Sequence, residues 1–106
     1  METVKISEGT MERFTHKSAD DQRFILDVDR LIQTDEGYAG DAIALLGRFE
    51  DFYQDLITDQ KNILIQLDAL RMSEKTKTLR YRELFTQKLF NQSFLLHLEK
   101  YGLKEE

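Results

Sequence analysis

The sequence predicts an all-α protein, in which a short N-terminal helix and a long antiparallel helical hairpin form a three-helix bundle that self-associates. Apolar residues recur at every seventh position over four heptads, a helical pattern: Ala42, Phe49, Leu56, Ile63 and Leu70. The 106 residues include no proline, the residue that breaks helices. A hydrophobic content of 41% with a charged content of 33% is typical of soluble helical proteins.

A single domain is expected, because domains most often hold about 100–150 residues. Residues 1–17 are polar and weakly patterned, so we expect a flexible N-terminal arm with Phe14 as its anchor. Residues 18–106 are expected to form one helical bundle domain. Its three helices are predicted over about residues 19–33, 41–72 and 78–101.

The first helix is predicted to begin at Ser18. Ser18 with Asp21 three residues later resembles a capping box, although glutamate or glutamine is the usual partner. Apolar residues then follow at the spacing of one helix face: Phe24, Ile25, Val28, Leu31 and Ile32. The helix should end near Gln33, because residues 34–37 (Thr-Asp-Glu-Gly) have the composition of a turn.

The long helix is predicted to begin after Asp41, a suitable N-cap. Two further columns run beside the first: Leu46, Tyr53, Gln60 and Leu67, and Ile43, Glu50, Ile57 and Leu64. Three columns make a face wider than the seam of a two-stranded coiled coil, so this helix should contact at least two partners. Gly47 falls on the polar side, where it is either simply tolerated or permits close approach of another chain.

A turn is expected between Met72 and Thr78, where no apolar residue follows Met72 and either Ser73 or Thr78 can cap the next helix. Because no glycine lies here, a continuous helix through residues 72–78 is the alternative. The last helix should end near Tyr101, since Gly102 followed by an apolar residue is a C-terminal cap signal.

The last helix is apolar nearly all round near residues 94–98, where only His97 interrupts the apolar residues. A helix that is apolar on every side is buried on every side, and three helices cannot surround it. We therefore expect a homodimer, and in addition another protein as a partner. The predicted protein interface consists of Phe85, Leu89, Phe90, Phe94, Leu96 and Tyr101.

Composition limits the chemistry. The sequence contains no cysteine, which excludes disulfides, thiolate metal sites and cysteine nucleophiles. Phosphate-binding loops, nucleophile elbows and histidine clusters are also missing, so we expect no catalytic residue, no cofactor and no small-molecule substrate. No apolar run is long enough to span a membrane, and the cytoplasm is the expected compartment.

Charge is unevenly distributed along the chain. The net charge is −5, with −8 in residues 1–70 and +3 in residues 71–106. Asp51, Asp55 and Asp59 share one helix face and could hold a divalent cation, but we interpret them as a solvated acidic stripe. Pairs of Asp55 or Asp59 with Arg80 or Arg82 are expected to help set the hairpin register.

The predicted function is a non-catalytic protein–protein interaction module, a small adaptor or regulatory subunit that acts through helix packing. Nucleic-acid binding by the basic segment 71–88 is the alternative, because basic side chains interleaved with aromatic ones can neutralise phosphates and stack on bases. Its candidate contacts are Lys75, Lys77, Arg80, Arg82 and Lys88. No helix-turn-helix or zinc-finger spacing accompanies them, so this reading ranks second.

Overall fold

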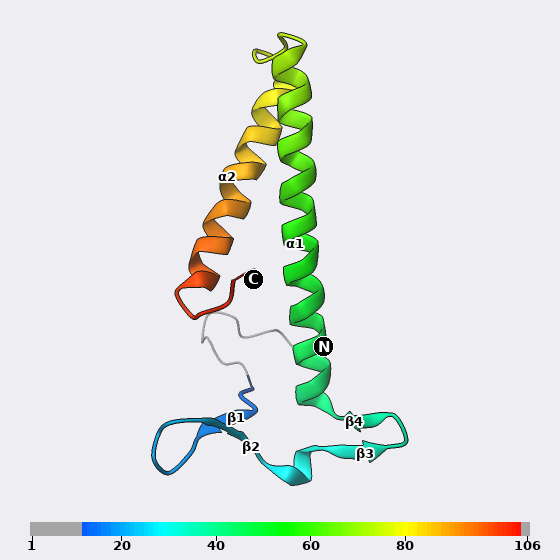
Figure 1. Cartoon of the computed structure of the whole chain (residues 1–106), viewed down its shortest axis with the longest axis vertical. Coiled ribbons are helices and arrows are strands. Elements are labelled where there is room, and N and C mark those ends of the chain that lie inside the picture. The colour runs from blue at the N-terminus through cyan, green and yellow to red at the C-terminus, as the bar shows by residue number, and fades with distance from the viewer. Residues whose placement is uncertain (1–11, 105–106) are drawn as a thin grey trace, which may run out of the picture. The chain divides into compact units, whose positions relative to one another are not determined.

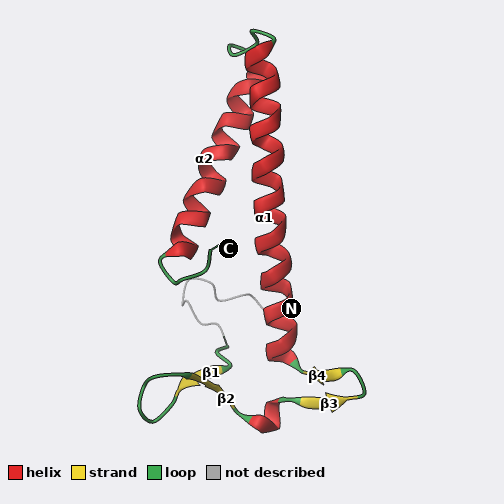
Figure 2. Ribbon diagram, in the orientation of Figure 1, coloured by secondary structure: helices red, strands yellow, loops and turns green. Residues whose placement is uncertain are grey.

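The computed structural model describes residues 12–104, which contain two long helices and two small antiparallel β hairpins (Figures 1 and 2). The prediction of an all-α three-helix bundle is therefore wrong. The chain divides into two compact units, residues 1–48 and residues 49–106. Within the predicted arm over residues 1–17, residues 1–11 lie outside the described part, whereas Thr15–Lys17 form strand β1.

The first hairpin pairs β1 with β2 (Phe24–Leu26), so that Thr15 lies opposite Leu26. Ser18, predicted to cap a helix, instead closes the loop between these strands. Its Oγ donates a hydrogen bond to Asp20 at 2.6 Å and accepts one from the Arg23 backbone N–H at 3.2 Å. Serine and aspartate offer the backbone such local alternatives to a helix, which is why cap residues and loop residues look alike in sequence.

The second hairpin follows a single turn of 3-10 helix, η2 (Val28–Arg30), and pairs β3 (Ile32–Thr34) with β4 (Gly37–Ala39). The turn expected at residues 34–37 is present, but it joins two strands rather than two helices. Thr34 Oγ1 donates a hydrogen bond to the Gly37 carbonyl at 2.9 Å. The helix predicted over residues 19–33 fails because β-branched and aromatic residues favour strands, and a short helix without a packed partner is marginal.

Arg30 makes contacts with several separate parts of the N-terminal unit. Its guanidinium donates a hydrogen bond to the Glu12 carboxylate at 2.8 Å and lies 4.7 Å from the centre of the Phe14 ring. This hydrogen bond to Glu12 raises the pKa of the Arg30 guanidinium above its ordinary value. The Arg30 carbonyl would lie 2.6 Å from a Cβ placed on Gly40, whose φ is +137°. Only glycine fits at position 40.

Helix α1 spans Asp41–Met72 and helix α2 spans Leu79–Glu99, close to the ranges that the apolar columns predict. Figure 1 shows the two helices adjacent near their connecting turn and diverging away from it. Near the turn, the buried residues Ile63, Leu67 and Leu84 form a core, against which Leu70 and Tyr81 pack. Helix packing next to the turn therefore organises the C-terminal unit.

The turn between the helices ends α1 with a Schellman motif. The Lys75 N–H donates to the Leu70 carbonyl at 2.8 Å and the Glu74 N–H to the Arg71 carbonyl at 3.0 Å. Glu74 takes the left-handed position that glycine usually holds, with φ of +58°. Thr78 then caps α2 by accepting a hydrogen bond from the Tyr81 N–H at 3.2 Å. The chain forms a hairpin here, and the continuous helix is excluded.

The C-terminal end of α2 repeats this motif with the expected residue. The Leu103 N–H donates to the Leu98 carbonyl at 3.1 Å, and the Gly102 N–H donates to the Glu99 carbonyl at 2.9 Å. Gly102 has φ of +81°, so the cap signal read from Gly102 is confirmed.

Candidate protein-interaction surface

Polar side chains mark the two edges of the seam where α1 and α2 face each other. At one edge, Gln60 Nε2 donates a hydrogen bond to the Lys88 carbonyl at 3.0 Å. At the other edge, Asn91 Nδ2 approaches Asp59 Oδ2 at 3.4 Å. These contacts establish which sides of the two helices lie on the same face of the hairpin.

The Gln60 edge opens onto an apolar surface to which both helices contribute. On α1, the neighbours of Gln60 on the same helix side are Tyr53, Ile57 and Leu64. On α2, Phe85 lies one turn before Lys88, whose Nζ stands 5.1 Å from the Phe85 ring centre. Leu89 and Leu96 continue that side of α2. We name this surface the apolar face: Tyr53, Ile57, Leu64, Phe85, Leu89 and Leu96.

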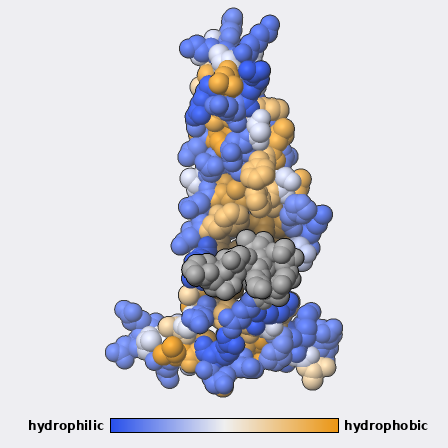
Figure 3. Space-filling model, turned by 180° about the vertical axis from the view of Figure 1, so that it is seen from behind, coloured by the Kyte–Doolittle hydropathy of each residue, from blue (hydrophilic) through white to orange (hydrophobic). Residues whose placement is uncertain are grey.

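The apolar face is open to solvent along both helices. Leu64 is 41% exposed, Phe85 38%, Leu89 49% and Leu96 53%, while Tyr53 and Ile57 are half-buried. Single exposed apolar residues are ordinary on protein surfaces, but a row on two adjacent helices makes this surface a candidate interaction site. Figure 3 shows one side of the molecule from behind, on which hydrophobic residues also gather over the helices and are bordered by hydrophilic ones.

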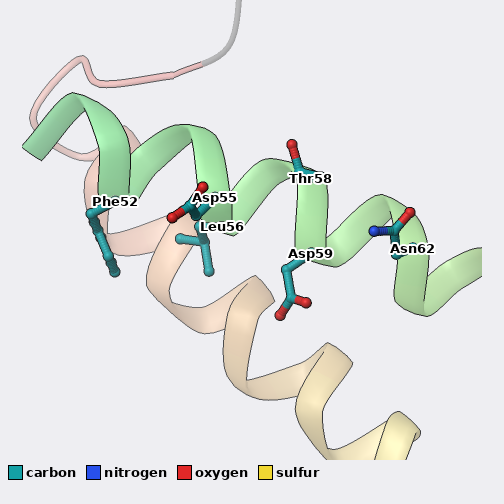
Figure 4. Close-up of a pocket in the computed structure, with 6 residues that line it drawn as sticks. All are labelled: Phe52, Asp55, Leu56, Thr58, Asp59 and Asn62. Carbon is teal, nitrogen blue, oxygen red and sulfur yellow. The ribbon is translucent and has the colours of Figure 1, made fainter.

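The Asp59 edge has a different character, because its aromatic residues adjoin carboxylates. The Phe52 and Phe94 rings lie 6.1 Å apart, and Phe90 lies 5.1 Å from Phe94 in an edge-to-face arrangement. A shallow pocket of about 410 Å³ lies beside them, lined by Phe52, Asp55, Leu56, Thr58, Asp59 and Asn62. Figure 4 shows Phe52, Leu56 and Asp59 on the side of α1 toward α2, whereas Thr58 points away.

The structure therefore divides the six predicted interface residues among three places. Phe85, Leu89 and Leu96 lie on the apolar face. Phe90 and Phe94 lie at the opposite edge, and Tyr101 lies beyond the end of α2 with 82% of its surface exposed. The predicted interface includes no α1 residue, although Ile57 and Leu64 stand in one of the apolar columns from which a second partner for the long helix is expected.

A buried polar layer at the seam was also missed. Asn91 is only 2% exposed and accepts a hydrogen bond from Gln87 Nε2 at 2.9 Å. Gln60 Oε1 is buried, and within residues 12–104 no hydrogen-bond donor reaches it. The available signal was Gln60 itself, the single polar residue in an otherwise apolar column. Buried polar residues of this kind restrict the register in which two helices can pack.

The basic segment is partly engaged inside the hairpin. The Arg71 guanidinium contacts the Tyr81 hydroxyl and the Asp68 carboxylate, and these contacts raise the pKa of Arg71 above its ordinary value. Arg80 donates to Gln66 Oε1 at 2.9 Å, so the expected pairing of Arg80 with Asp55 or Asp59 is not formed.

Lys75, Lys77 and Arg82 are exposed near the turn, and Lys88 is half-buried beside Phe85.

The described residues offer little for other kinds of site. Among residues 12–104, no three histidine, aspartate or glutamate side chains cluster as metal ligands would. Neither helix in that range is long and apolar enough to cross a membrane. No protein-family model matches the chain, and no curated protein or solved structure is significantly similar to it.

Proposed function

We propose that this protein is a non-catalytic protein–protein interaction module, a small adaptor or regulatory subunit that acts through helix packing. The observation that supports this is the apolar face, where exposed leucines and Phe85 line both helices. Burying such a row against a partner contributes a favourable free energy of roughly 25 cal/mol per Å² of apolar area, which is absent while the row faces water. We place the proposed module in the cytoplasm, which fractionation of the native cells tests.

The test is affinity capture from native extract with three forms of the full chain: wild type, Leu89→Glu and Ile65→Glu. Leu89 lies on the apolar face, whereas Ile65 is an equally apolar α1 residue that is 67% exposed on the outer side of the hairpin. We expect wild type and Ile65→Glu to retain the same partner, and Leu89→Glu to lose it. Capture that is identical for all three forms would refute the proposal.

Nucleic-acid binding is the second candidate, favoured by the charge of the turn. Residues 71–82 carry five basic side chains and one acidic one, a net charge of +4. Phosphate binding by such a cluster weakens steeply as salt rises. A gel-shift assay with mixed DNA and RNA at low salt should show binding that the Arg80→Ala, Arg82→Ala double variant loses. No shift at low salt eliminates this candidate.

A further inference from the structure

The apolar face has the same spacing on both helices. Tyr53, Ile57 and Leu64 repeat the intervals of Phe85, Leu89 and Leu96, four and then seven residues. The midpoint of the α1 row lies between residues 58 and 59, and that of the α2 row lies between residues 90 and 91. The 3.4 Å contact of Asp59 with Asn91 places both midpoints at the same height along the hairpin.

Two rows centred at one height suit an interface with two-fold symmetry. In such an interface the same patch of both subunits is used, and residue i contacts j while j contacts i. If a second copy is related to the first by a two-fold axis perpendicular to the helices at this height, the two copies run antiparallel. Phe85 of one copy then lies opposite Leu96 of the other. The same rotation brings Tyr53 opposite Leu64 of the second copy.

The charge distribution favours the antiparallel orientation of the two copies over the parallel one. The turn end, residues 71–82, has a net charge of +4. The open end, residues 49–60 with 94–104, carries five acidic and two basic side chains, a net charge of −3, and the intervening segments 61–70 and 83–93 are each neutral. Antiparallel packing places the turn end of one copy, with its charge of +4, against the open end of the other, with its charge of −3. Parallel packing places ends of like charge together, which costs free energy.

The available area is sufficient for a dimer. The 21 residues of α2 make a helix about 31 Å long at 1.5 Å per residue, and two adjacent helices are about 20 Å wide. The whole side of the hairpin that carries the apolar face therefore offers roughly 600 Å² per copy, at the low end of the roughly 600–1,000 Å² per partner of standard interfaces.

We propose that the occupant of the apolar face is a second copy of this chain, packed antiparallel to form a four-helix bundle. The inference rests on the proposed function, because it names the partner of the same surface. In this arrangement Arg82 lies opposite Glu99 of the second copy, since these positions are equidistant from the midpoint of the α2 row. The hydrogen bond of Gln60 to the Lys88 carbonyl borders the apolar face near the height of the symmetry axis, where polar residues fix the register of helical bundles.

Sedimentation equilibrium of the full chain tests for the second copy. We expect a mass of twice 12.5 kDa for wild type and Ile65→Glu, and a single chain mass for Leu64→Glu and Leu89→Glu. Helical circular dichroism should be unchanged in all four, because each substituted side chain is solvent-exposed. A wild type that remains monomeric at roughly 100 µM would contradict the proposed dimer. Loss of partner capture by Leu89→Glu would then still support the proposed function.

The relative orientation of the two copies is tested by the distance between spin labels, one on each copy. The chain contains no native cysteine, so one introduced cysteine carries the label. In Lys77→Cys, labels on two antiparallel copies should lie at least about 40 Å apart, since each turn is roughly 20 Å from the axis at 1.5 Å per residue. Labels within roughly 25 Å, about the width of a four-helix bundle, indicate parallel copies and overturn the antiparallel arrangement.

The charge contribution is tested by exchange of one pair. Arg82→Glu should weaken dimerisation several-fold at low salt, and addition of Glu99→Lys should restore it. If the double variant dimerises as weakly as Arg82→Glu alone, Arg82 and Glu99 do not lie opposite each other in the dimer.

Discussion

The two units of this chain are stabilised in different ways. In residues 49–104, the helical hairpin has a buried core in which Leu67 is fully shielded and Ile63 is 4% exposed. In residues 12–48, no described side chain is buried, and large apolar residues such as Val28 (79%) and Phe24 (63%) face solvent. The helical unit depends on side-chain packing, whereas the N-terminal unit depends on turns, loop hydrogen bonds and the contacts of Arg30.

This contrast makes the units sensitive to different substitutions. Packing is lost when a buried methyl group is removed, because a cavity remains in its place. Turn geometry is lost when a backbone conformation becomes unavailable, whatever the size of the side chain.

The largest effect is expected from Leu67→Ala. Removing a fully buried leucine costs about 3–4 kcal/mol, within the usual range for this substitution, and should lower the free energy of unfolding by that amount. Chemical denaturation followed by helical circular dichroism measures it. Val28→Ala is the control and should change stability by less than about 0.5 kcal/mol, as for other exposed positions. Equal effects of the two substitutions would contradict the contrast between the units.

The next effect is expected in the N-terminal unit. Gly40→Ala would place a Cβ 2.6 Å from the Arg30 carbonyl at a φ of +137°, and should destabilise the second hairpin by about 2–3 kcal/mol. Amide hydrogen exchange of β3, β4 and the Ala44 N–H, which donates to the Gly40 carbonyl, reports the loss.

Gly47→Ala is the matched control for Gly40→Ala. A Cβ at this position of α1 meets nothing within 4 Å, so alanine should stabilise the helix by up to about 1 kcal/mol through its higher helix propensity. If Gly40→Ala were tolerated as well as Gly47→Ala, backbone geometry would not be what limits the N-terminal unit.

These differences explain how far the fold could be predicted from the sequence. Helix α1 was predictable because its apolar columns persist over 32 residues, which no strand pattern imitates. Residues 15–39 were not, because the spacing of Phe24, Val28 and Leu31 covers only two helical turns. Over so short a stretch, strand-forming residues and the hydrogen bonds of Ser18 outweigh helical periodicity.

The candidate surface was predictable in part for a related reason. The apolar residues of α2 are visible in sequence, but their division into two sides depends on how α2 is rotated toward α1. That rotation follows from contacts between the helices, such as Gln60 with Lys88, which the sequence alone does not pair. The apolar face therefore depends on the two helices together and is not visible in the sequence of either one.

A smaller effect is expected at the two Schellman motifs, in which different residues hold the left-handed position, Glu74 in one and Gly102 in the other. Glu74 holds the left-handed position at the end of α1, where a side chain costs about 1 kcal/mol relative to glycine. Glu74→Gly should therefore raise the midpoint of thermal unfolding, and Gly102→Ala at the end of α2 should lower it. A destabilising Glu74→Gly would show that the Glu74 side chain makes a compensating interaction.

The smallest effect concerns pH and the first hairpin. The hydrogen bond from Ser18 and the backbone N–H of Gln22 lower the pKa of the exposed Asp20 carboxyl below 3.8. A carboxyl with a lower pKa in the folded state stabilises that state above pH 3.8, and the contribution is lost as pH falls through the folded-state pKa. NMR titration of wild type should show the lowered pKa, and Ser18→Ala should return it toward 3.8. The helical core, held by apolar contacts, should keep its circular dichroism over the same pH interval. If instead the helices melted together with the Asp20 transition, the two units would be energetically coupled and the contrast between them would not hold.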